Sequence, residues 1–243
     1  SGKSTTLYSA LRKVSTPENN IVTVEDPIEM IHEDFNQIGV QSAIGVTFGS
    51  ILKTILRQDP DIIMIGEMRD LETAENAVQS ALTGHLVLST LHTNDAPSSI
   101  TRLLDLGVPS FLIQATLIGV IAQRLLRVIC EYCKESFTMG ASELRMAGID
   151  AGLKGAVKLY RGRGCNRCRQ TGYRGRSAAF EVMPYSEAIR KMTTAKTNIE
   201  NIRIRAKEEG MVTLRENAIQ KMLDGVTSYE EVLRVTSARK IVV

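Results

Sequence analysis

Several features that often reveal a protein's class are scarce in this sequence. The 243 residues include no Trp, aromatic residues make up only 5% of them, and the formal net charge is +3. A charge this small does not by itself indicate a nucleic-acid partner. The longest apolar run, residues 111–122, is interrupted by Gln114 and Gly119, so it is too short and too polar to span a bilayer. Internal repeats and low-complexity segments are also missing from the sequence.

Apolar residues are abundant by contrast and make up 43% of the chain. This is enough for one large core or two modest ones. Helix and strand patterns alternate through the first half, which favours an α/β fold. From residue 185 onward the pattern is helical, and we expect short helices at about 186–193, 198–208, 213–223 and 228–236.

The stretch from Asp61 to Thr93 predicts a strand, a helix and a second strand. Apolar runs at 62–65 and 86–91 enclose a segment in which Ala and other apolar residues recur with a helical period. Asp70 is placed to cap this helix and Gly84 to end it. At this length the pattern predicts a parallel βαβ unit, and such sheets hold ligands at the carboxyl ends of their strands.

Charged residues follow the predicted strands at that edge. Glu67 and Arg69 come after the first strand of the unit, and His92 comes after the second. Glu25 and Asp26 come after an earlier strand, residues 21–24, and predict a second acidic corner of the same cleft. A carboxylate in this position can hold a metal-bound water or accept a proton. The alternative in each case is an ordinary polar loop.

Less distinctive patterns predict the elements between these segments. We expect short strands at 35–40 and 46–48, a helix at 50–57 and a helix from Asp95 to Leu106. A Leu- and Ile-rich stretch predicts one long helix over about 110–128, and residues 148–164 show no strong period.

The first residues look like the tail of a phosphate-binding loop. Ser1-Gly2-Lys3-Ser4 matches the end of G-x-x-x-x-G-K-[ST], in which backbone N–H groups hold the phosphates, the Lys meets their oxygens and the Ser holds Mg²⁺. An amphipathic helical pattern follows, as such a loop requires. Because the chain begins inside the motif, we expect preceding residues to be missing and the 243 residues alone to fail as an ATPase.

All four cysteines lie in two C-x-x-C pairs with 31 residues between the pairs: Cys130, Cys133, Cys165 and Cys168. Each pair can present two thiolates to one ion, and two pairs complete a tetrahedral Zn²⁺ site. Four protein ligands leave no open position, so we expect the zinc to be structural. Disulfide bonds are the alternative, which a reducing compartment would disfavour.

Six arginines lie within 16 residues around the second cysteine pair: Arg161, Arg163, Arg167, Arg169, Arg174 and Arg176. They predict a patch for phosphates, acidic lipid or an acidic protein face. The alternative is a solvated loop whose arginines have partners within the molecule.

Taken together, these motifs resemble the secretion ATPase superfamily, the motors of type II secretion and type IV pilus assembly. The matching segments, in order, are Ser1–Thr5 (Walker A tail), Thr23–Glu29 (Asp box), Leu56–Asp70 (Walker B), Thr83–Asn94 (His box), Ala122–Leu125, the four cysteines, Gly172–Arg176 and Thr227–Thr236. The resemblance covers essentially the whole chain. The tetracysteine motif favours the assembly and secretion branches over the pilus-retraction branch.

The resemblance implies a RecA-like P-loop ATPase core with a mainly parallel sheet in residues 1–128. A tetracysteine zinc module in 129–184 and a C-terminal helical region in 185–243 would follow. It implies a homo-hexamer in the cytoplasm, peripheral to the inner membrane, that hydrolyses ATP. Its partners would be the platform and cytoplasmic-domain proteins of a secretion or pilus machine, with acidic lipid as a further candidate and no nucleic acid.

The same resemblance implies roles for individual residues. The residues that would bind ATP lie in the Walker A tail and the Asp box: Ser1, Gly2, Lys3, Ser4, Thr5 and Asp26. Ser4 and Glu67 would hold Mg²⁺, and Glu25 would be the general base. His85 and His92 would sense the γ-phosphate or link neighbouring sites, and Arg69 would reach a neighbour's nucleotide as arginine fingers do. For His85 the alternative is a cation at a helix C-terminus.

Two other functions compete with this one. A RecA-like nucleic-acid motor with a zinc ribbon would use the arginines on phosphates, but only Tyr160 and Tyr173 lie near them to stack on bases. A non-catalytic zinc adaptor would leave the combination of Glu25, Glu67 and His92 without a purpose.

Overall fold

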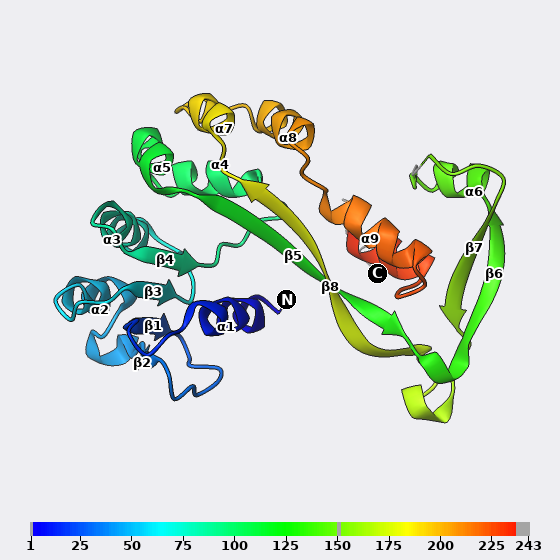
Figure 1. Ribbon diagram of the computed structural model, residues 1–243, viewed down its shortest axis with the longest axis horizontal. Coiled ribbons are helices and arrows are strands. Elements are labelled where there is room, and N and C mark those ends of the chain that lie inside the picture. The colour runs from blue at the N-terminus through cyan, green and yellow to red at the C-terminus, as the bar shows by residue number, and fades with distance from the viewer. Residues whose placement is uncertain (1, 150–151, 237–243) are drawn as a thin grey trace. The chain divides into compact units, whose positions relative to one another are not determined.

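The computed structural model describes residues 2–149 and 152–236 (Figure 1). Ser1, which was expected to bind phosphate, lies outside the described residues. Backbone contacts divide the chain into two compact units. The sheet unit comprises residues 2–120 and 183–209, and the cysteine unit comprises residues 121–149, 152–182 and 210–236. The domain boundaries expected after residues 128 and 184 stay a prediction.

The sheet unit is built on four strands in the order β2-β1-β3-β4. These are β1 (Ile21–Glu25), β2 (Asn36–Gly39), β3 (Ile62–Ile65) and β4 (Leu86–Ser89). All neighbours are parallel, so the carboxyl ends of the strands meet at one edge. The two central strands, β1 and β3, are buried along their whole length, as expected for a sheet covered on both faces. The predicted α/β fold and βαβ unit are confirmed.

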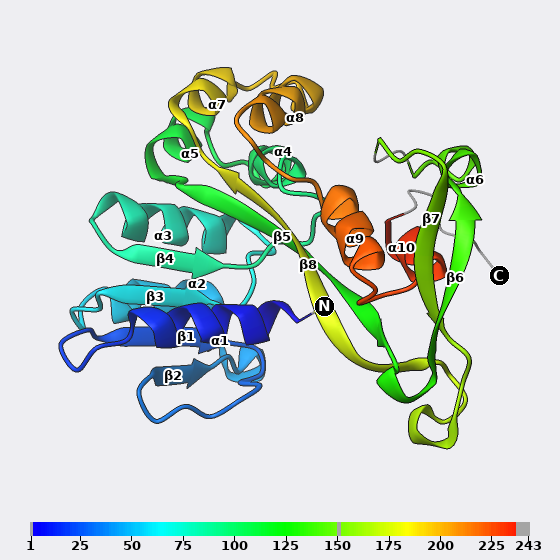
Figure 2. The same ribbon diagram turned by 45° about the vertical axis from the view of Figure 1, so that its right-hand side comes forward.

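Alternation along the central strands sends side chains to two separate cores. One core joins β1 and β3 to α2 (Phe48–Ile55) and α3 (Leu71–Leu82), through Val22, Val24, Ile51, Leu52, Ile55, Ile63, Ile65 and Ala77. The other joins the same strands to α1 (Lys3–Val14), through Tyr8, Leu11, Ile21, Phe35, Ile62 and Met64. The helix that begins at Lys3 therefore covers one face of the sheet, and α2 and α3 cover the other (Figure 2).

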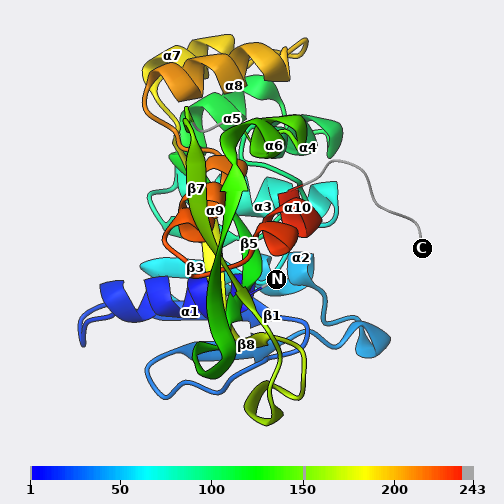
Figure 3. The same cartoon turned by 90° about the vertical axis from the view of Figure 1, so that its right-hand side faces the viewer.

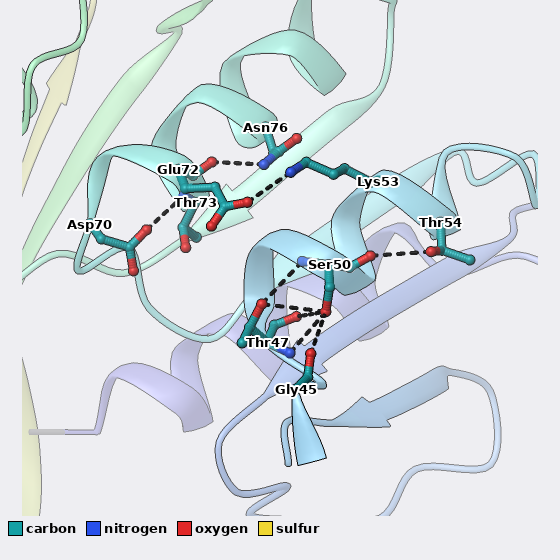
Figure 4. A network of polar contacts seen from close by, with 9 residues as sticks. All are labelled: Gly45, Thr47, Ser50, Lys53, Thr54, Asp70, Glu72, Thr73 and Asn76. Carbon is teal, nitrogen blue, oxygen red and sulfur yellow. Dashed lines mark hydrogen bonds and ion pairs between the residues drawn. The ribbon is translucent and has the colours of Figure 1, made fainter. Parts of the chain in front are cut away.

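Helix α3 begins and ends where the sequence predicts. The Asp70 carboxylate accepts a hydrogen bond from the Thr73 N–H at 2.8 Å, and Gly84 has a left-handed φ of 102° after the last turn. Lys53 of α2 is paired with Glu72 of α3 at 2.7 Å (Figure 4). Gly49 lies under Glu72, where a Cβ would come within 2.6 Å of the carboxyl carbon, so the glycine permits this close approach.

The single helix predicted over 110–128 is wrong. Helix α5 (Ser110–Thr116) ends early, and residues Gly119–Ile129 form strand β5, which pairs with β8 (Tyr173–Pro184). Helix α4 (Ser98–Asp105) precedes α5, as expected. The predicted strand at 46–48 is also wrong, because only one isolated bridge, Gln41 with Val46, is formed there.

The cysteine unit contains an antiparallel pair, β6 (Lys134–Gly140) and β7 (Ala156–Gly162), and α6 (Ala141–Met146) lies in the segment that connects the two strands (Figure 3). Helices α9 (Leu214–Leu223) and α10 (Tyr229–Thr236) share a hydrophobic core with these strands. Short 3₁₀ turns at Glu131–Cys133 and Asn166–Cys168 carry the cysteines. Strand β7 lies in the segment for which the sequence showed no pattern.

The expected C-terminal helices are confirmed, since α7 (Glu187–Met192) and α8 (Ile199–Glu208) precede α9 and α10 at the predicted places. By backbone contacts, however, α7 and α8 belong to the sheet unit, and α9 and α10 belong to the cysteine unit. Within residues 2–149 and 152–236, none of the helices has both the length and the apolar character that crossing a bilayer requires.

Candidate functional site

Glu67 lies just beyond the carboxyl end of β3, where the chain leaves the sheet. Gly66 precedes it and donates its N–H to Val24 O at 2.8 Å, and a Cβ on Gly66 would lie 3.3 Å from that oxygen. The Glu67 side chain is 16% exposed, with one oxygen 2.7 Å from His92 Nε2 and the other accepting a hydrogen bond from Arg69 Nε at 2.8 Å. The three groups predicted to meet at this edge lie together.

The electrostatics of this group centre on the Glu67 carboxylate. Its hydrogen bond to Arg69 and its charge raise the pKa of that guanidinium, and the charge of Asp26 adds to the same effect. Arg69 is thus paired with a carboxylate of its own chain, Glu67. The carboxylate has partners on both oxygens and still faces solvent in part, as a group that exchanges partners requires.

Lys3 reaches the same edge from α1. Its Nζ donates a hydrogen bond to Leu91 O at 3.2 Å, and Leu91 directly precedes His92. Gly2, before the helix, has a left-handed φ of 76°, which a residue with a side chain rarely adopts. Ser4 and Thr5 lie in the first turn of α1. The helix N-terminus and the Lys3 amine together offer positive potential at the carboxyl edge of the sheet.

Glu25 ends β1 and is only 4% exposed. It accepts hydrogen bonds from Tyr8 at 2.6 Å, Thr23 at 2.7 Å and Gln37 at 3.2 Å. None of these three partners was expected from the sequence. The one signal that pointed to Tyr8 was its place on the inward face of α1, three residues before Leu11. Glu25 is therefore a buried carboxylate held by neutral donors.

Asp26 follows Glu25, joined to Pro27 by a cis peptide bond. A recess of about 270 Å³ opens beside it in the sheet unit. The recess is lined by Asp26, Val40, Ser42, Thr47, Phe48, Gly49, Arg69, Asp70, Glu72 and Thr73. Because Arg69 belongs both to this lining and to the Glu67 group, the recess adjoins the group at the end of β3.

His85 is not brought to this edge. It precedes β4 (Leu86–Ser89), so in a parallel sheet it lies at the amino end, opposite to Glu67 and His92. Its Nδ1 lies 2.8 Å from Ser80 O and 3.0 Å from the Thr83 hydroxyl, at the C-terminus of α3. This position matches the alternative of a histidine at a helix C-terminus, and the role expected for His85 toward a nucleotide stays a prediction.

The four cysteines form a compact cluster in the cysteine unit. All four Sγ atoms lie within 4.8 Å of one another, and no disulfide joins them. The Cys130–Cys165 and Cys133–Cys168 pairs are each 3.9 Å apart, and Cys165–Cys168 is 3.7 Å apart. Zn–S bonds of about 2.3 Å in a tetrahedron separate the sulfurs by about 3.8 Å. The cluster therefore has the size and donor set that fit one Zn²⁺.

Backbone N–H groups point at the sulfurs, as expected for thiolates. Gly164 N lies 3.3 Å from Cys133 Sγ, and Cys165 N and Gly172 N lie 3.2 and 3.3 Å from Cys168 Sγ. Burial acts to raise the pKa of Cys168, but these N–H groups and the neighbouring thiols lower it to about 6. At Cys168 the arrangement favours the negatively charged sulfur, which is the form that binds a metal, whereas burial raises the pKa of Cys133 to about 11.

Some arginines of the cluster have partners within the molecule. Arg161 is paired with Glu135 at 2.8 Å, and Arg167 stacks over Tyr132 with its guanidinium carbon 4.0 Å from the ring centre. Arg163, Arg169 and Arg176 are exposed. The cluster is thus partly a solvated, internally paired loop and partly an exposed basic surface.

Comparison with known proteins gives consistent matches. The family described as Type II/IV secretion system protein matches residues 1–234. The chain is 48% identical over 97% of its length to the type IV pilus assembly ATPase TfpB of Acinetobacter baylyi, and covers 40% of that protein. It is 46% identical, also over 97% of its length, to the type II secretion system protein E of Pseudomonas aeruginosa, and covers 46% of it. The chain thus spans less than half the length of these relatives.

Solved structures agree on the fold. The pilus retraction motor PilT with bound ADP aligns with a TM-score of 0.66 and 28% identity, over 98% of this chain and 58% of that one. The ATPase DotB of Legionella pneumophila aligns with a TM-score of 0.68 at 21% identity, over 98% of this chain and 57% of that one, and that likeness shows the fold alone.

Proposed function

Because the chain belongs to the Type II/IV secretion system protein family, we propose that it is the nucleotide-hydrolysing part of a secretion or pilus-assembly ATPase. Relatives named for both activities match nearly the whole chain, which supports the class of machine but does not favour one branch. The tetracysteine cluster favours an assembly or secretion machine over a retraction motor. The source of energy would be ATP hydrolysis.

The observation that carries this proposal is the meeting of three separate segments at one edge of the sheet. The Glu67 carboxylate lies 2.7 Å from His92, and Lys3 contacts the residue next to His92. Phosphoryl transfer needs positioned charges more than covalent chemistry. A carboxylate, an amine and an imidazole at the carboxyl edge of a parallel sheet meet that need.

Each residue has a proposed part in the reaction. Lys3 and the N–H groups of Gly2 to Thr5 would hold the phosphates of ATP, with Asp26 nearby. The Ser4 hydroxyl and the Glu67 carboxylate have the hard oxygen atoms that Mg²⁺ prefers, and Mg²⁺ would neutralise phosphate charge. Glu25 would accept the proton of the attacking water.

The remaining polar groups would act on the developing charge. His92 and Arg69, both bound to Glu67, would sense the γ-phosphate or the charge that develops during transfer. His85 would act from a different place, since it lies at the opposite edge of the sheet. His85 would therefore reach only a nucleotide that is bound to a neighbouring copy of the chain.

The cysteine cluster is proposed to hold one structural Zn²⁺ through Cys130, Cys133, Cys165 and Cys168. The spacing of the sulfurs and the N–H groups directed at them support this. The metal would stabilise the cysteine unit and would take no part in hydrolysis, because four protein ligands leave no position for a substrate.

We further propose a homo-hexamer that works in the cytoplasm, at the inner membrane, with the platform and cytoplasmic-domain proteins of its machine. The exposed arginines, such as Arg163 and Arg169, support an acidic lipid surface as a further partner. A RecA-like nucleic-acid motor with a zinc ribbon is the second candidate. Its tight nucleic-acid binding would fall steeply with added salt.

The test is Glu67→Gln in the full-length parent protein, with ATP turnover and ATP binding measured separately. Because the change removes the charge that would hold the metal, turnover should fall by roughly 100-fold or more while binding is largely kept. Glu187→Gln on α7, which also removes a paired carboxylate of the sheet unit, is the matched control and should leave turnover unchanged. Near-normal turnover in Glu67→Gln would remove Glu67 from the active site.

A further inference from the structure

Glu25 lies in a polar cluster that three elements of the sheet unit build. Tyr8 of α1 donates its hydroxyl proton to Glu25 Oε2 at 2.6 Å. Thr23 of β1 and Gln37 of β2 donate to Oε1 at 2.7 and 3.2 Å. Tyr8 is 2% exposed and Glu25 4%, so water competes little for these bonds.

The direction of each bond follows from the donors and acceptors present. Gln37 Nε2 lies 3.0 Å from the Tyr8 hydroxyl and 2.9 Å from Met30 O, both acceptors, and its Oε1 accepts the His32 N–H at 2.6 Å. This fixes the orientation of the amide. The Tyr8 hydroxyl has two acceptors in reach, Glu25 Oε2 at 2.6 Å and Met30 O at 3.1 Å, and its single proton is directed at the nearer one, Glu25.

Within the described part of the chain, Glu25 is held by neutral donors and forms no ion pair with a Lys, Arg or His. The groups that face it are Tyr8 from α1, Thr23 on its own strand, Gln37 from β2 and Gly66 at the end of β3. Asp26, next in sequence, adds only negative charge. Burial and the hydrogen bond to Glu25 raise the pKa of Tyr8 well above its usual range, so the phenol stays a neutral donor.

Counting lone pairs shows what Tyr8 controls. A carboxylate offers about four acceptor positions, two on each oxygen. Thr23 occupies one position on Oε1, and the other faces Gln37, whose two N–H groups are shared among Glu25, Tyr8 and Met30. Tyr8 occupies one of the two positions on Oε2 and leaves the second open, on the oxygen that it orients. It is the position at which Glu25 would accept a proton from water.

We propose that Tyr8 is a positioning residue that holds Glu25 in the orientation and charge state needed to accept a proton from the attacking water. This rests on the proposed function, in which Glu25 is the general base. Tyr8 lies in the same helix as Lys3, so one element would set both the phosphate contact and the base. The competing explanation is that the hydroxyl merely satisfies a buried acceptor.

The experiment compares Tyr8→Phe with Tyr185→Phe in the full-length parent protein. Tyr185 is also buried, and its hydroxyl donates to Thr193 at 2.7 Å, so the control loses a similar bond elsewhere in the sheet unit. The measurements are kcat, KM for ATP and the pH profile of kcat, with binding of a non-hydrolysable ATP analogue as the check on folding.

Tyr8→Phe removes a donor that stabilises the charged form of Glu25 relative to its protonated form. The acid limb of the kcat profile should therefore move up by about one pH unit, and kcat at neutral pH should fall about tenfold, with KM within about twofold. Placing 3-fluorotyrosine at position 8 keeps the ring and strengthens the donor, so the limb should move down instead. This second variant decides the matter if Tyr8→Phe folds poorly.

The two hypotheses fail in different ways. A parent protein that does not hydrolyse ATP overturns the proposed function and this assignment with it. A parent that hydrolyses ATP, with Tyr8→Phe and Tyr185→Phe giving the same kcat and the same pH profile, overturns the assignment of Tyr8 alone. An unmoved acid limb in the fluorotyrosine protein does the same.

Discussion

The cysteine cluster and the carboxyl edge of the sheet are both places where charged groups converge, but they are assembled differently. The cluster takes four identical ligands from two short segments, and three of the four cysteines are buried. The sheet edge takes unlike groups from the ends of separate elements, and its histidine, His92, has a side chain that is 72% exposed. A closed set of ligands suits a permanent ion, and an open set suits a substrate that must leave.

The two regions also differ in how ligand binding would affect the stability of the folded chain. The cysteine cluster would convert metal binding directly into stability of its unit, because the ligands meet only when the chain is folded. At the sheet edge the contacts of Glu67 are exchangeable, since His92 and Arg69 are both largely exposed. Changes in the first region should therefore move stability and changes in the second should move turnover.

The largest expected effect is the loss of zinc in Cys165→Ser. Structural zinc sites of this kind are worth on the order of 10–16 kcal/mol of apparent binding energy, so removing one of four ligands should lower zinc affinity by several powers of ten. Purified parent protein should contain about one Zn²⁺ per chain, and the variant should contain far less and unfold at a lower temperature. Metal analysis and calorimetric unfolding are the measurements.

Asn166→Ser is the matched control, because Asn166 lies in the same turn as Cys165 without supplying a sulfur. It should keep its zinc. ATP-analogue binding should survive in both variants if the two regions have the separate tasks described. Metal-free protein that stays fully folded would contradict the structural role of the cluster.

A smaller effect, of about 1–3 kcal/mol, is expected for Glu231→Gln in the cysteine unit. The Glu231 side chain is fully buried and contacts Arg127 and Arg234 at 2.7 and 2.6 Å. Burial acts to raise its pKa, but hydrogen bonds from both arginines lower it to about 2. The folded state therefore binds a proton less readily than the unfolded state, and the carboxylate contributes stability at neutral pH.

The sign of the pH dependence follows from the lowered pKa. The contribution of Glu231 is complete above its ordinary pKa of about 4.5 and disappears as the pH falls toward 2. Urea unfolding at pH 7 and pH 3 should show a gap between Glu231→Gln and the parent that narrows at pH 3. The neighbouring, exposed Glu230→Gln is the control, and a gap that does not depend on pH would disprove the assignment.

The two regions also differ in how far the sequence reveals them. The C-x-x-C spacing of Cys130 and Cys133 and the caps Asp70 and Gly84 each depend on only a few neighbouring residues, so the sequence alone predicted the cysteine pairs and the ends of α3. The apolar run 110–128 failed because Leu and Ile fit a buried helix and a strand equally well. Residues 119–129 form strand β5 because they pair with β8, whose first residue lies 44 positions after the end of β5.

The candidate site shows the same limit. The ends of β3 and β4 are visible in the sequence, so the meeting of Glu67 with His92 could be expected. The donors to Glu25 come from α1 and β2, and which side chains face it depends on how those elements pack on the sheet. His85 was grouped with His92 because both lie in the segment that resembles a His box. They lie at opposite ends of β4, which the linear motif does not show.

The smallest expected effect separates these two histidines. His92→Ala removes the partner that lies 2.7 Å from Glu67, and turnover in the full-length parent should fall about tenfold, which corresponds to about 1.4 kcal/mol. His85→Ala removes a contact with Ser80 O at the end of α3, so it should lower the unfolding temperature slightly and change turnover by less than about twofold. Steady-state turnover and thermal unfolding of both variants are the measurements. If His85→Ala instead costs as much turnover as His92→Ala while stability is kept, His85 must act on the nucleotide of a neighbouring copy, and the sheet edge of one chain is then only part of the active site.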